Sequence, residues 1–245
     1  MKYAITMLLV CCWMVRSASA ELIITSDTTI DFTHLAFAGS IRIYDEPDSP
    51  TTVDIVDGAI IGGNIHVWGN SILNHRAGFT AGVIFGHDNS TINIFGGVVA
   101  DGEDIRTFDD SVANIYGGRF GDDIQAFDSS TINLYGGTFD KDGTGASLSA
   151  IGDGVINVYL RQYEFAEDGF HLSGVLLDGS EFKKVWVGVD PFDLRTARIV
   201  LHTIPEPHSL TLAGLAFLVA LAVLRHRPSN LICPIQIPRC QGDPS

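Results

Sequence analysis

A short sequence motif that repeats along the chain limits the possible folds more than any other feature. Residues 91–97 read TINIFGG, and 113–118 (ANIYGG) and 131–137 (TINLYGG) repeat the pattern. The asparagines of the three copies are Asn93, Asn114 and Asn133, and a further one, Asn157, continues the series. Successive asparagines are separated by 21, 19 and 24 residues. Self-similarity at so short a spacing is typical of repeat proteins. Weaker copies upstream extend the repeat over much of the chain.

Each repeat reads as a series of short strands. Residues 91–95 alternate apolar and polar side chains, which predicts a strand, and the glycine pair at 96–97 ends it. Two more short apolar segments, 98–99 and 105–108, follow before the next copy. The sequence therefore predicts an all-β fold, a parallel β-solenoid of about 19–24 residues per coil. A β-sandwich, which also uses short strands and glycine turns, remains the alternative.

In a solenoid, equivalent residues of successive coils lie one strand spacing apart, about 4.8 Å. Ile92 and Ile94 would then point into the core, and Asn93 between them would point outward. The outward asparagines, Asn93, Asn114, Asn133 and Asn157, have two interpretations. They form a ladder in which each amide donates to the next, or they are polar residues that the outer face tolerates.

Acidic residues recur at fixed positions of the repeat. The chain has 29 acidic and 15 basic residues and a formal net charge of -14, which argues against a nucleic-acid partner. One row contains Asp88, Asp109 and Asp128, and a second contains Asp104 and Asp123. Stacked carboxylates repel each other, so something must compensate their charge. Calcium is one candidate for these five residues, and a role in forming turns is the other.

Catalytic motifs are weak in this sequence. Right-handed β-helices include polysaccharide lyases and hydrolases, and Arg106 and Arg119 lie near the acidic rows. These arginines are also natural charge partners of neighbouring aspartates. No His-Glu-x-x-His motif that would indicate zinc is present. We therefore expect no enzymatic activity, with a divergent β-helix polysaccharide lyase or glycoside hydrolase as the alternative.

The first twenty residues have the features of a secretory signal peptide. Lys2 precedes an apolar run, and the small residues Ala18 and Ala20 stand where a signal peptidase would cleave, before Glu21. The apolar run is too short for a membrane span. We expect residues 1–20 to be removed on export.

The C-terminal region holds a second targeting pattern. The triplet Pro205, Glu206 and Pro207 precedes an uncharged run at 208–224, and Arg225 and Arg227 follow. Residues 205–227 resemble the PEP-CTERM sorting signal of Gram-negative bacteria. The resemblance implies one transmembrane helix at 208–224, transient anchoring in the inner membrane, and recognition by an exosortase-type processing enzyme. Delivery to the cell surface or to an exopolysaccharide matrix would follow.

These observations divide the chain into five parts. The signal peptide at 1–20 precedes solenoid repeats at 21–165, terminal coils or a cap at 166–204, the sorting signal at 205–227, and an unstructured tail at 228–245. Residues 21–204 contain no cysteine, so burial and backbone pairing must stabilise the body. We expect an exported, surface- or matrix-associated protein with a structural or polysaccharide-associated role.

Overall fold

The computed structural model describes residues 21–31, 39–45, 49–100, 105–139, 146–189 and 198–204. Every regular element among them is a β-strand. No helix in these ranges has the length and apolar character needed to cross a bilayer. The expected signal peptide with Ala18 and Ala20, the sorting signal at 205–227 with its helix, and the tail at 228–245 lie outside the described residues.

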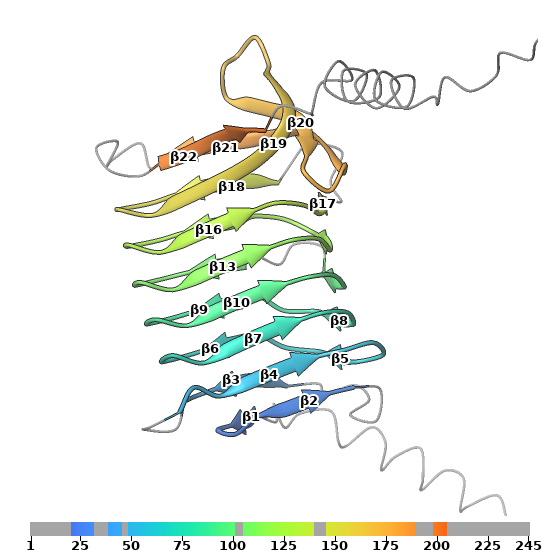
Figure 1. Cartoon of the computed structure of the whole chain (residues 1–245), viewed down its shortest axis with the longest axis vertical. Coiled ribbons are helices and arrows are strands. Elements are labelled where there is room, and N and C mark those ends of the chain that lie inside the picture. Colours follow the sequence, from blue (N-terminus) through green and yellow to red (C-terminus); the bar gives the residue numbers. More distant parts are fainter. Residues whose placement is uncertain are drawn as a thin grey trace, which may run out of the picture. The chain divides into compact units, whose positions relative to one another are not determined.

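The strands form three columns of parallel neighbours (Figure 1). The first column is β1 (Glu21–Ile24), β3 (Ser40–Ile43), β6 (Ile65–Val67), β9 (Ile84–Gly86), β12 (Ile105–Thr107), β15 (Ile124–Ala126), β18 (Ser147–Ala150) and β21 (Glu181–Val189). The second is β2 (Thr28–Ile30), β4 (Thr52–Ile55), β7 (Ile72–His75), β10 (Thr91–Ile94), β13 (Val112–Ile115), β16 (Thr131–Leu134), β19 (Val155–Phe165) and β22 (Arg198–Thr203). The third is β5 (Ile60–Ile61), β8 (Phe79–Thr80), β11 (Val98–Val99), β14 (Arg119–Phe120) and β17 (Thr138–Phe139).

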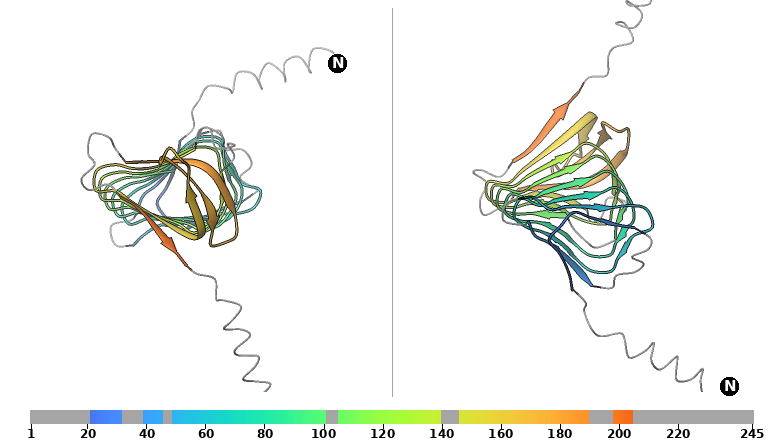
Figure 2. Two further views of the ribbon diagram at one scale, coloured as in Figure 1. Left: turned by 90° about the horizontal axis from the view of Figure 1, so that it is seen from above. Right: turned by 60° about the horizontal axis from the view of Figure 1, so that its bottom comes forward.

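Five successive coils, from β3 to β17, contribute one strand to each column, and the other described coils contribute to the first two columns. The chain is therefore a parallel β-solenoid, as the repeat predicts. Seen along the stack, successive coils overlie one another (Figure 2). The register pairs Asn114 with Asn93 on one side and with Asn133 on the other, all in parallel strands. A β-sandwich would place neighbouring strands antiparallel, so that alternative is wrong.

The core follows from the alternation within each strand. In β10, β13 and β16 the second and fourth residues are buried, and the first and third point outward. Ile92, Ala113 and Ile132 form one buried row with no exposed surface. Isoleucine dominates the largest fully buried side chains, because a β-branched side chain packs well against its copy one strand away.

The repeat ends in an antiparallel segment. β20 (His171–Leu176) pairs with the C-terminal half of β19 on one side and with the first half of β21 on the other. It links the first two columns and buries Leu160, Leu172 and Leu176 against the last coils. β21 and β22 lie in the region 166–204, for which the sequence predicts terminal coils or a cap.

Candidate functional site

The outward asparagines of the second column form a hydrogen-bonded ladder. The Nδ2 of Asn114 donates to the Oδ1 of Asn93 at 3.0 Å, and the Nδ2 of Asn133 donates to the Oδ1 of Asn114 at 2.9 Å. Asn157 donates to Asn133 at 2.9 Å. The ladder interpretation is therefore the one that the structure shows.

The ladder extends beyond the four expected asparagines. Asn93 donates to Asn74 at 3.0 Å, and a ring nitrogen of His202 lies 3.1 Å from the Oδ1 of Asn157. Sequence reasoning missed both. Asn74 is followed by His75 and Arg76 rather than by an aliphatic residue and an aromatic one, and His202 lies where the repeat has faded.

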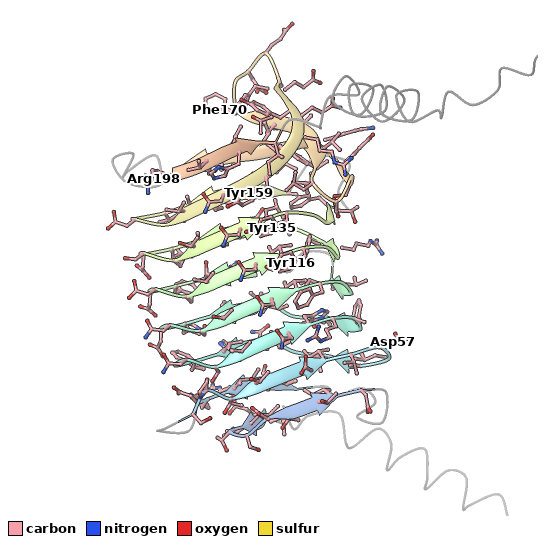
Figure 3. All side chains as sticks on the ribbon, in the orientation of Figure 1. Asp57, Tyr116, Tyr135, Tyr159, Phe170 and Arg198 are labelled. Atoms are coloured by element: carbon pink, nitrogen blue, oxygen red, sulfur yellow. The ribbon has the colours of Figure 1, made fainter. Side chains whose placement is uncertain are left out.

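A column of stacked rings runs beside the amide ladder. Phe95, Tyr116, Tyr135 and Tyr159 stack with centroids 5.2, 5.0 and 4.4 Å apart and interplanar angles of 18° or less. Figure 3 shows the three tyrosines one above another on successive coils. Arg76 covers the free face of Phe95 at 5.0 Å, and His202 stacks on Tyr159 at 4.6 Å. Because the faces are covered, the rings expose their edges and hydroxyl groups.

The first acidic row lies in left-handed turns. Asp88, Asp109 and Asp128 have φ angles of 56°, 56° and 55°, a conformation that aspartate tolerates better than most residues. The carboxylate of Asp109 accepts from the backbone N–H of Asp88 at 3.1 Å, and Asp128 accepts from Asp109 at 3.4 Å. Asp88 in turn accepts from Gly69 at 3.0 Å. The geometry is the one that the turn interpretation expects.

Replacing Asp109 tests that role. Gly69 and Gly152 adopt the same left-handed conformation at the equivalent position of other coils, with φ of 67° and 68°. We expect D109G to change the free energy of unfolding by less than about 0.5 kcal/mol, because relief of the strained φ offsets the lost hydrogen bond. D109A keeps the strain and loses the bond, so it should cost about 2 kcal/mol. Urea denaturation measures both, and equal losses would contradict this account.

The second acidic row bridges coils in a similar way. The carboxylate of Asp123 accepts from the backbone N–H of Ser147 at 2.8 Å and from the side-chain amide of Gln125 at 3.2 Å. At the equivalent position Asn64 accepts from the N–H of Val83 at 3.0 Å. Asp104 lies outside the described residues. Among the residues that are described, no three His, Cys, Asp or Glu side chains gather closely enough to hold a metal ion.

A second aromatic cluster lies on the first column. Trp68 and His87 stack at 3.8 Å, and Phe108 continues the stack to Phe127 at 4.7 Å. Burial is the main cause that lowers the pKa of His87 and of the neighbouring His66. Both imidazoles are therefore held in the neutral form more strongly than a solvated histidine.

His75 is the one histidine of the described core and interrupts an aliphatic row. It is fully buried in the row of Ile55 and Ile94, and its ring nitrogens lie 2.8 Å from the carbonyl of Gly96 and 3.1 Å from the hydroxyl of Thr80. Burial lowers the pKa of His75. This neutral, hydrogen-bonded histidine serves the fold.

The lowered pKa of His75 makes stability depend on pH. The unfolded chain takes up the proton first, near pH 6.5, so the free energy of unfolding falls as pH drops below that value towards the folded pKa. One histidine contributes a slope of up to about 1.4 kcal/mol per pH unit, and His66 and His87 add to it with the same sign. Urea denaturation between pH 7 and pH 5 should show a shallower slope for H75Q than for the wild type. Identical slopes would contradict the assignment.

A groove lies at the capped end. Tyr163, Phe182, Lys183, Glu164 and Glu181 are among the residues that line a hollow of about 500 Å³ beside the antiparallel strands. The described aspartates of the two acidic rows lie elsewhere, between the strands of the coils. Arg106 points outward from β12 and pairs in register with Gln125, while Arg119 is exposed on β14. The structure thus does not bring these arginines and the groove carboxylates into one site.

No protein-family model, curated protein or solved structure matches this chain. The outer faces of the solenoid and the two ends of the sequence are the features that bear on function. The second column provides the most regular surface, because its ladder and ring stack continue through β10, β13, β16 and β19.

Proposed function

We propose that this protein is exported and delivered by its PEP-CTERM-like tail to the cell surface or extracellular matrix, where it has a structural or polysaccharide-associated role. One observation carries the proposal: the triplet at 205–207, the uncharged run at 208–224 and the basic residues Arg225 and Arg227 follow one another in the order of that sorting signal. A leader with small residues at 18–20 precedes the body and agrees with export.

The body suits such a role. Residues 21–204 contain no cysteine, so their stability is independent of thiol oxidation outside the cell. Side-chain ladders connect coil to coil on the outside, and a continuous aliphatic row fills the inside. A stack of this kind presents one surface pattern many times over, which favours binding to a polymer or a matrix rather than to a single small molecule.

The mass of the mature protein tests the proposal. The full chain is expressed in a Gram-negative host that has an exosortase-type enzyme, and each cell fraction is analysed by intact mass spectrometry. We expect a surface or matrix species that begins at Glu21 and ends near 205–207. Alanine at all three of Pro205, Glu206 and Pro207 should leave the C-terminal end uncleaved, whereas alanine at 228–230 should not. Recovery of wild-type protein with both ends intact would contradict the proposal.

A further inference from the structure

Up to and including its ring stack, the outer face of the second column carries no charged side chain in the coils of β10, β13, β16 and β19. The outward residues of these strands, with the ring residue that directly follows β10, β13 and β16, are threonine, valine, asparagine, phenylalanine or tyrosine. They are Thr91, Asn93, Phe95, Val112, Asn114, Tyr116, Thr131, Asn133, Tyr135, Val155, Asn157 and Tyr159. We call this set the neutral face. These twelve outward positions are uncharged although the chain has a net charge of -14.

Charged groups border the neutral face. At one end Arg76 forms an ion pair with Asp54 at 2.8 Å, and at the other Arg198 is exposed on β22 (Figure 3). The exposed turns with Asp109 and Asp128 run along the side that precedes β13 and β16. This carboxylate row disfavours a polyanion on the face, and it also disfavours a second copy of the same acidic chain.

The chemistry of the neutral face suits a ligand rich in hydroxyl groups. An asparagine amide has two N–H groups and two lone pairs on its oxygen, and the ladder uses one of each at Asn114 and Asn133. The remaining N–H and lone pair can bind a hydroxyl group that donates and accepts. Tyr116, a residue that is 43% exposed, adds a phenol hydroxyl at the edge of the same face.

The repeat of the neutral face matches an extended sugar chain. Equivalent amides and hydroxyls recur once per strand, about 4.8 Å apart, and an extended β-1,4-linked glycan advances by a similar distance per sugar. Since the rings stack on one another, they offer edges and hydroxyls, so we expect recognition by hydrogen bonds rather than by stacking on a ring face.

We propose that the neutral face binds an extended, uncharged β-1,4-linked glycan that lies along the solenoid axis. This proposal deepens the polysaccharide-associated role proposed above and rests on it. The glycan would contact the amide ladder in the middle of the face and the row of tyrosine hydroxyls at its edge.

Affinity electrophoresis of the full chain tests the proposal, with hydroxyethyl cellulose as the neutral probe and alginate as the acidic one. Thr131→Glu introduces a carboxylate on the neutral face, and Thr91→Glu does so independently on β10. Thr138→Glu makes the same change on the third column, where Thr138 is exposed. We expect retardation of the wild type by the neutral probe alone. The two face variants should bind about tenfold more weakly, while T138E binds as the wild type does and all variants keep cooperative melting.

Several results would overturn the binding proposal. They are no retardation of the wild type, retardation by alginate instead, or equal weakening by T131E and T138E. Sedimentation that shows a dimer dissociated by T131E would make the neutral face a contact between copies. The mass measurement is separate: a chain that binds the neutral glycan but keeps both terminal segments would contradict the sorting proposal alone.

Discussion

A variant that lacks one whole coil, residues 109–127, should still fold. The deletion joins Phe108 to Asp128, so Asp128 occupies the turn position of Asp109. β16 would pair with β10 in the same register that β13 has now, with Asn133 beside Asn93. In a stack that depends on nearest neighbours, stability falls only by the share of one coil. We expect a β-rich circular dichroism spectrum and one cooperative, somewhat lower melting transition.

Deletion of Ala113 alone is the control, and we expect it to lower the free energy of unfolding far more. Removal of one strand residue reverses which side chains face the core, so Asn114 would point inward and Ile115 outward. Burial of an amide without partners and exposure of an isoleucine together cost about 4 kcal/mol or more. Both variants are compared by thermal and urea unfolding. Loss of structure in the 19-residue deletion, with the single deletion tolerated, would contradict a repeating stack.

The second large effect concerns the amide ladder. We expect N114A to lower the free energy of unfolding by about 2 kcal/mol, because Asn114 both donates to Asn93 and accepts from Asn133, and each bond contributes about 1 kcal/mol. The adjacent amides would also lose partners on a half-buried face. Urea denaturation at neutral pH measures the change.

Asn89 provides the matched control for the ladder. It is an exposed turn residue, so N89A should stay within about 0.5 kcal/mol of the wild type. If N114A and N89A change the free energy of unfolding equally little, the asparagines are only polar residues that the outer face tolerates. The ladder would then contribute nothing measurable to stability.

The repeat made much of the fold predictable. Copies of Asn-Ile-Tyr-Gly-Gly must align if each inward isoleucine is to pack on its counterpart, and this condition defines the parallel columns and the outward asparagines. The same alignment accounts for the stacking of Phe108 on Phe127, whose ring centroids lie 4.7 Å apart.

Other features needed coordinates because they break the repeat or leave no mark in its alternation. His75 occupies a core position where the neighbouring coils have isoleucine. It can be buried there because its ring nitrogens form hydrogen bonds with the Thr80 hydroxyl and the Gly96 carbonyl. The left-handed φ of Asp88, Asp109 and Asp128 is a property of the turn and has no alternation pattern to reveal it. The antiparallel pairing of β20 depends on contacts with two strands distant in sequence.

The neutral face could not be predicted from the sequence alone either. Each outward residue is visible in the sequence, but its neighbours across strands are known only once the register is known. The register also decides between interpretations of the acidic rows, because it brings backbone N–H donors to Asp109 and Asp128. Charge counting alone left both calcium and turn formation open, and the absence of a calcium-loop motif favoured turn formation.

The distance between Thr91 and Thr131 tests the stack most directly. Both face outward in the second column, and each pairs in register with Val112 between them. With the natural cysteines replaced by serine, spin labels at T91C and T131C should lie about two strand spacings apart, roughly 10 Å, and show strong dipolar broadening relative to either single label. A doubly labelled protein whose spectrum equals the sum of the two singles would contradict the parallel solenoid.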